Sequence, residues 1–360
     1  MPILTLPSFL QNAGRALQVS LVLAVTGAGS AAMAAEPVKG GGATTAAPIY
    51  RDWARAFQAS SQVEVRYEGT GSSDGQRRII SRELDFAGSD VPFTDAELKK
   101  LDLIQVPTLV GGLVPVVNLP GVQRGELRLS GELLARIFWG DITRWDHADI
   151  KALNPQLALP SLPIARVVRS DASGSSMTLM RYLALYHSGI PAQAASTSVK
   201  WPGEVQAVKG SDNVREAVRK TKGAIAYLSY NHVSQDKLTE VSLRNKAGQF
   251  VMPNEGSFLS AVNAATQEES AGKPFKLVDQ GGERSWPLTE VTYVLLPRVL
   301  NSQRPQSLQA ARFFYWSFMQ GDKLVRQTGF IPLPGRTQAK ALSQFLLMKD
   351  EKGNNVDFVR

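Results

Sequence analysis

Residues 164–176, with the sequence IARVVRSDASGSS, join a strand-like run to the start of a helix. The apolar run is typical of a buried strand, and Ser173 with its small neighbours is typical of a helix N-cap. A helix that begins here leaves its first N–H groups unpaired, and its dipole adds partial positive charge. The stretch therefore predicts an anion cradle, although an ordinary Ser-rich N-cap accounts for the same residues.

Arg169 stands at the end of the strand-like run and offers two donors side by side to a tetrahedral anion. Asp171 follows closely enough to hold the guanidinium in place. The hydroxyls of Ser173 and Ser175 can add donors, and Gly174 lets an anion approach the backbone. We expect these residues to form one side of a binding site.

Two further loops rich in Gly, Ser and Thr also precede helical patterns. Residues 38–45, VKGGGATT, lead to a segment in which Ile49, Trp53 and Phe57 recur every four residues. Residues 69–75, GTGSSDG, follow a strand-like segment. Three such loops favour N–H and hydroxyl donors that converge on one anion.

Asp90 ends a short apolar segment, residues 84–90, that reads as a buried strand. Open α/β sheets place ligands at the carboxyl ends of their strands, so Asp90 is a candidate site residue. A simple turn or cap is the alternative. Thr94 and Glu97 have the spacing of a capping box for the next helix.

Residues 104–118 form a long apolar run that reads as β-strand, and we expect Gly111 and Gly112 to break it. We expect it to cross between two domains at a short hinge, and a plain β-bulge is the alternative. Strand-like and helical patterns alternate along the rest of the chain, which predicts a mostly parallel α/β architecture.

The first residues have the pattern of an export signal. One charge, Arg15, precedes a mostly apolar run that leads to the small-residue sequence Ala32-Met-Ala34. We expect cleavage near Ala34 or Ala35 and release without a lipid anchor, since no Cys is available to carry one. The absence of Cys also excludes disulfides, thiolate metal sites and cysteine nucleophiles.

The formal net charge of +8 favours an anionic partner. Lys and Arg are scattered and no recognition module appears, so a small anion is preferred to nucleic acid. His147, His187 and His232 stand in unrelated contexts, and we expect each at the surface or at a helix cap. No metal site or catalytic residue is predicted.

Several motifs, in order and in register, make the chain resemble the periplasmic phosphate-binding proteins of ABC importers. The motifs are GGGAT (40–44), GTGSS (69–73), DFAGSD (85–90), RSDASGS (169–175), VKWP (199–202) and GAIAY (223–227). The resemblance implies a two-lobed periplasmic binding protein fold (type II), with mixed or parallel sheets flanked by helices. It assigns residues 1–34 to the signal, 35–112 and 286–360 to one lobe, and 113–285 to the other.

By the same resemblance, phosphate lies in the cleft between the lobes and is delivered to membrane permease subunits by a monomer that needs no cofactor. The implied phosphate-binding residues are Thr44, Thr45, Ser72, Asp90, Arg169, Ser173, Gly174 and Ser175. Thr45 replaces a common aromatic, Ser175 replaces Thr, and the loop 203–210 departs from the family's glycine-rich turn. A secreted phosphatase, or another oxyanion-binding protein on the same fold, is the alternative.

Overall fold

The computed structural model describes residues 36–270 and 276–358. The predicted export signal, residues 1–34, lies outside the described residues. Within the described ranges, no helix combines the length and the apolar character needed to cross a membrane.

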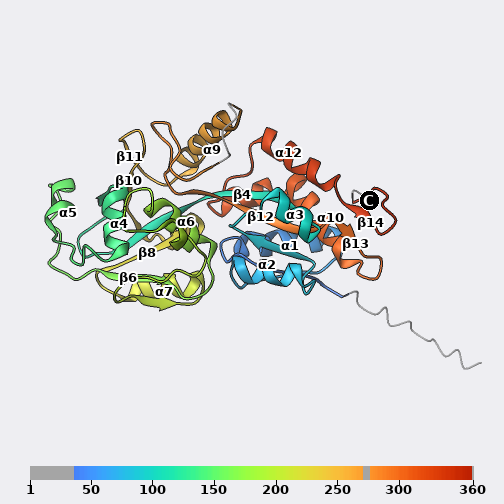
Figure 1. The fold of residues 1–360 in the computed structure, drawn as a ribbon, viewed down its shortest axis with the longest axis horizontal. Coiled ribbons are helices and arrows are strands. Elements are labelled where there is room, and N and C mark those ends of the chain that lie inside the picture. The colour runs from blue at the N-terminus through green and yellow to red at the C-terminus, as the bar shows by residue number, and fades with distance from the viewer. Residues whose placement is uncertain (1–35, 271–275, 359–360) are drawn as a thin grey trace, which may run out of the picture. The chain divides into compact units, whose positions relative to one another are not determined.

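Strands and helices alternate along much of the chain (Figure 1). The strands are β1 (Val38–Gly42), β2 (Val65–Gly69), β3 (Phe86–Ser89), β4 (Leu103–Asn118), β5 (Arg128–Leu129), β6 (Ala165–Arg169), β7 (Gln206–Val208), β8 (Ala224–Ser229), β9 (Thr239–Glu240), β10 (Ser242–Arg244), β11 (Phe250–Val251), β12 (Thr289–Pro297), β13 (Val299–Leu300) and β14 (Lys349–Asp350). The helices are α1 (Ala47–Ser61), α2 (Ser72–Ile80), α3 (Asp95–Leu101), α4 (Gly131–Trp139), α5 (Ala148–Leu153), α6 (Gly174–Leu183), α7 (Gly210–Lys220), α8 (Tyr230–Asp236), α9 (Glu255–Ser270), α10 (Gln306–Gln320), α11 (Asp322–Gln327), α12 (Gly335–Phe345) and a short 3-10 helix, η1 (Ala192–Ala194).

The main sheet has the strand order β2-β1-β3-β12-β4-β8-β6-β7, and β9 also pairs with β4. Strand β1 is parallel to β2 and β3, and β6 is parallel to β7 and β8. The pairs β3–β12, β12–β4 and β4–β8 are antiparallel. The sheet is therefore mixed, and the expectation of a mostly parallel architecture is wrong for its central strands.

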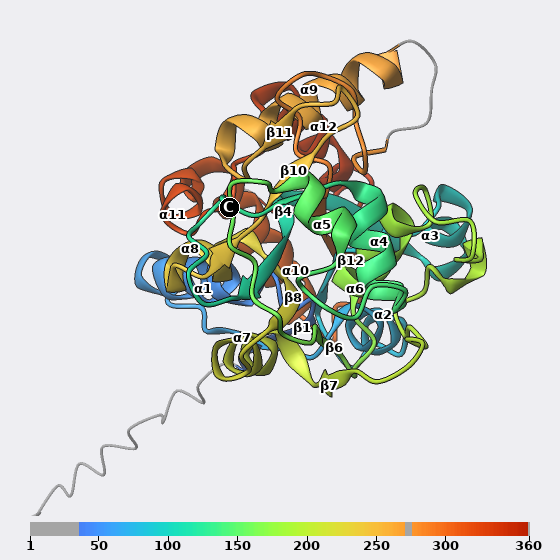
Figure 2. The same cartoon turned by 90° about the vertical axis from the view of Figure 1, so that its left-hand side faces the viewer.

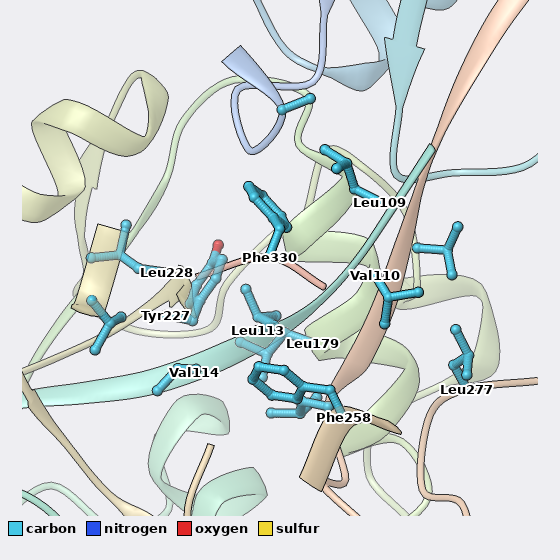
Figure 3. Close-up of a cluster of buried hydrophobic side chains, with 14 of the residues drawn as sticks. Leu109, Val110, Leu113, Val114, Leu179, Tyr227, Leu228, Phe258, Leu277 and Phe330 are labelled. Atoms are coloured by element: carbon cyan, nitrogen blue, oxygen red, sulfur yellow. The ribbon is translucent and has the colours of Figure 1, made fainter. Parts of the chain in front are cut away.

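Strand β4 runs between two groups of elements in Figure 1, one around β12 and the other around β8. Contrary to expectation, Gly111 and Gly112 do not break it. A Cβ atom at Gly112 would lie 2.2 Å from the ring of Phe258, and one at Gly111 would lie 3.0 Å from the ring of Phe330. The two rings lie on opposite sides of β4 (Figure 3), so the glycines make room for aromatic packing within a continuous strand.

The structure confirms several helix features that were predicted from local sequence. Ile49, Trp53 and Phe57 form part of the buried face of α1, which confirms the four-residue spacing. Thr94 and Glu97 form the capping box of α3. The helices that start near the predicted loops gather at one place: Figure 2 shows α2, α6 and α7 around β1, β6 and β7.

Candidate functional site

The starts of α2 and α6 meet in close contact. A Cβ atom added to Gly174, the first residue of α6, would lie 2.6 Å from Ser72 Oγ and 2.8 Å from Asp90 Cβ. Gly71 precedes α2 with φ 102°, and its own Cβ would lie 2.8 Å from the carbonyl oxygen of Ala172. These glycines let the predicted cradle and the second loop approach each other to a distance that a side chain would prevent.

Arg169 is buried where β6 ends, and it donates on two sides. Its Nε donates to Asp171 Oδ1 at 2.7 Å, and its Nη2 donates to the other oxygen of the same carboxylate. Nη1 donates to Thr44 Oγ1 at 3.0 Å and to Ser211 Oγ at 3.2 Å. Because Asp171 takes the Nε–Nη2 edge, the pair of donors available to an anion is the one formed by Nη1 and Nη2.

Asp171 fixes the orientation of this guanidinium. Its Oδ1 also accepts a hydrogen bond of 2.9 Å from the backbone N–H of Gly210, where α7 begins. Burial raises the pKa of Asp171, but the hydrogen bond and the charge of Arg169 outweigh it and hold the pKa below its ordinary value. The carboxylate is therefore ionised at neutral pH and forms an ion pair with Arg169.

Asp90 lies directly after β3 and is buried together with its donors. Thr45 Oγ1 lies 2.8 and 2.9 Å from its two oxygens, and Thr292 Oγ1 donates to Oδ1 at 2.6 Å. Its backbone N–H donates to Ser72 Oγ at 3.2 Å. Burial raises the pKa of Asp90 above its ordinary value, and the hydroxyls of Thr292 and Thr45 with the charge of Arg169 offset this rise only in part.

The start of α6 is held by hydroxyl groups. Ser173 is the N-cap, and its Oγ accepts a hydrogen bond of 3.4 Å from the N–H of Ser176. Ser176 Oγ and the hydroxyl of Tyr227 are 2.7 Å apart, and the same Tyr227 oxygen accepts from the N–H of Arg169 at 3.2 Å. Ser175 is buried in the same first turn. Strands β6 and β8 and helix α6 are thus connected directly beneath the predicted cradle.

The structure brings together the side chains predicted from three separate loops. Thr44 contacts Arg169, Thr45 contacts Asp90, and Ser72 lies beside both Asp90 and Gly174. Sequence analysis missed Ser211, Thr292 and Tyr227. The only local indication for Ser211 is its position after Gly210 at the start of a helix. Nothing in the neighbouring sequence distinguishes Thr292 from the other residues of its strand.

The three histidines do not all match their predicted surroundings. His147 caps α5, and His187 pairs with Asp141 at 2.7 Å between Nε2 and Oδ2. His232 is buried, so the expectation of a surface or cap position is wrong for it. Burial lowers its pKa to about 4. In the part of the chain that the structure describes, no group of three His, Asp or Glu side chains is placed to hold a metal ion.

Helix starts rather than net side-chain charge make this site suitable for an anion. The positive charge of Arg169 is balanced by Asp171, and Asp90 adds a further carboxyl group. Residues at four helix starts lie at the site: Thr45 just before α1, Ser72 and Gly174 as the first residues of α2 and α6, and Ser211 in the first turn of α7. A helix start offers unpaired N–H groups and the positive end of the helix dipole to an anion. The arrangement supplies many donors and one carboxyl acceptor, which suits an oxyanion that carries a proton.

Comparison with known proteins identifies the family. The PBP superfamily domain matches residues 26–318. The phosphate-binding protein PstS of Haemophilus influenzae is 37% identical over 313 residues, which cover 86% of this chain and 93% of that protein. The chain belongs to the PstS phosphate-binding protein family. The PstS protein of Pasteurella multocida is also 37% identical and covers 86% of this chain and 90% of its own length.

Solved structures agree with the fold of a two-lobed periplasmic binding protein. A high-affinity periplasmic phosphate-binding protein, PfluDING, bound with phosphate, superimposes with a TM-score of 0.68 at 20% identity, covering 86% of this chain and 93% of its own. A putative phosphate ABC transporter substrate-binding protein with bound phosphate from Clostridium perfringens gives a TM-score of 0.58 at 18% identity, covering 83% and 100%. These similarities extend over both groups of elements that β4 connects.

Proposed function

We propose that this chain is an exported periplasmic protein that binds inorganic phosphate between its two lobes and delivers it to the permease subunits of a phosphate ABC importer. The names of its relatives and the basic charge of the chain support this function. The proposed lobes are residues 35–112 with 286–360, and residues 113–285. The protein acts as a monomer, without a cofactor, catalytic residues or a nucleic-acid partner.

The proposed phosphate ligands come from both lobes. Thr44, Thr45, Ser72 and Asp90 belong to the first, and Arg169, Ser173, Gly174 and Ser175 belong to the second. The oxygens of phosphate replace the hydroxyls of Thr44 and Ser211 as acceptors from Nη1 of Arg169. The N–H groups at the starts of α1, α2 and α6 take the remaining oxygens.

The carboxyl group of Asp90 among these donors is the observation that carries the proposal. An ionised carboxylate repels a fully deprotonated oxyanion, but it accepts a hydrogen bond from one that still carries O–H. Phosphate retains at least one proton near neutral pH, whereas sulfate retains none. The site therefore suits phosphate better than sulfate.

Calorimetric titration of ligand-stripped protein with phosphate, sulfate and a small organic phosphate tests the proposal. We expect saturable heat with phosphate and little with sulfate; the absence of heat with phosphate would exclude the proposed function. A chromogenic phosphomonoester distinguishes a phosphatase. Turnover that purifies with the protein and is lost in Ser72→Ala or Arg169→Ala would contradict a purely binding role.

A further inference from the structure

Glu290 is a second buried carboxyl group beside the candidate site. It lies on β12 opposite Gly111 of β4, two residues before Thr292. Side chains alternate along a strand, so Glu290 points to the same face as Thr292, whose hydroxyl donates to Asp90. The proposed ligand Asp90 and Glu290 thus lie along one face of the sheet.

Glu290 has no partner of opposite charge. The residue is 6% exposed, and within the described ranges neither of its carboxyl oxygens has a hydrogen-bond partner. The neighbouring strand β4 carries no ionisable side chain, and β12 adds only Tyr293. Helices α2, α9 and α10 also pack against β12, and the ionisable residues described in them are Asp74, Arg77, Arg78, Glu255, Glu268, Arg312 and Tyr315. Further away, β3 is followed by Asp90, β8 contains Tyr227, and α8 contains Tyr230, His232 and Asp236.

The absence of a cation or donor beside Glu290 favours the protonated, neutral form of its carboxyl group. An ionised carboxylate without a cation or a donor is unstable in a buried environment. Burial, and then the negative charge of Asp90, raise the pKa of Glu290 well above its ordinary value. A bound anion brings further negative charge to the same region, so it makes ionised Glu290 less stable still.

We propose that Glu290 is a proton-binding control residue of the anion site, which gains a proton when an anion binds beside Asp90. This inference rests on the proposed phosphate site. The pKa of Glu290 is higher with the anion bound than without it, so affinity is complete below the pKa of the free protein. Affinity then falls by up to about tenfold per pH unit as the pH rises from the free to the bound value.

Glu290→Gln keeps the shape of the side chain and removes its ionisation. We would titrate the wild type, Glu290→Gln and the exposed control Glu68→Gln with phosphate from about pH 5 to about pH 9, the range in which buried Glu residues titrate. The ratio of the wild-type Kd to the Glu290→Gln Kd is the measured quantity, because the ionisation of phosphate cancels in it. We expect this ratio to increase with pH, whereas the ratio for Glu68→Gln stays constant.

Two further readouts separate the possible failures. Titrations in buffers of different ionisation enthalpy should show more protons taken up per phosphate by the wild type than by Glu290→Gln. If Glu290→Gln does not fold, the test uses infrared difference spectra of the wild type with and without phosphate. Adding phosphate should then increase the absorption band of protonated carboxyl groups. Parallel pH profiles, or an unchanged band, overturn the role of Glu290 alone. Failure of the wild type to bind phosphate at every pH would instead overturn the proposed function.

Discussion

Thr292 donates a hydrogen bond of 2.6 Å to Asp90 across 202 residues of sequence. It joins β12 to the end of β3, and Thr45 donates to the same carboxyl group from the loop before α1. Burial is the larger effect and keeps the pKa of Asp90 above its ordinary value, while the two hydroxyls oppose that shift and favour the ionised form. In the proposed site, ionised Asp90 is the acceptor that selects among anions.

Asp90→Asn should reduce the preference for phosphate over sulfate while leaving the fold intact. The variant retains the shape of the side chain but replaces an acceptor with an N–H donor that sulfate can use. Sites built around one such hydrogen bond can reject the analogue that lacks it by about 10⁴-fold, which sets the upper limit of the change. Competitive titration of both anions at matched ionic strength measures the ratio, with exposed Asp95→Asn as the control. An unchanged ratio in a folded variant would make Asp90 a structural turn residue.

Arg169→Ala should weaken phosphate binding strongly. Loss of two charge-assisted hydrogen bonds in a buried site costs about 2–5 kcal/mol, or tens- to thousands-fold in affinity. Calorimetry gives the Kd, and Arg181→Ala on the exposed side of α6 is the matched control. A change of less than about threefold, or under 1 kcal/mol, would place Arg169 outside the site.

Asp171→Asn should weaken phosphate binding although Asp171 is not a proposed ligand. An amide N–H in place of one oxygen opposes Nη2 of Arg169, so the guanidinium turns away from the orientation that Asp171 holds. We expect a loss of about tenfold, or about 1.4 kcal/mol. In a double-mutant cycle the substitution should have little further effect once Arg169 is Ala. Equal losses in both backgrounds would show that Asp171 acts independently of Arg169.

His232→Gln should make the folded protein less sensitive to acid. The pKa of His232 is about 4 in the folded state, and in the unfolded chain it is about 6.5. As pH falls below about 6.5 the unfolded chain binds a proton that the folded protein does not, so stability decreases until about pH 4. The full difference corresponds to about 3 kcal/mol, which Gln removes. Urea unfolding at about pH 7 and about pH 4.5 gives the loss of unfolding free energy on acidification for the wild type and for His232→Gln. His147→Gln is the control and should lose as much as the wild type. Equal decreases in the wild type and His232→Gln would contradict a buried neutral His232.

Local features of the fold could be predicted from the sequence because they depend on neighbours a few residues away. The capping box of Thr94 and Glu97 and the buried stripe of α1 are of this kind. The N-cap at Ser173 is another, since its hydroxyl bonds to an N–H within its own first turn. The loops and strand ends that hold the proposed ligands could be recognised on the same basis, whereas Thr44, Thr45 and Ser72 are singled out as ligands only through the family resemblance.

The sequence by itself thus determined the alternating elements, the helix starts and the residue types able to bind an oxyanion. Only the tertiary structure decided which of them meet: the sheet order places Thr292 against Asp90, and the start of α7 places Ser211 against Arg169. It also decided that β4 stays continuous and that His232 and Glu290 are buried. Hydrogen bonds between distant segments and the burial of polar side chains depend on how strands pair and helices pack, and no short stretch of sequence carries that information.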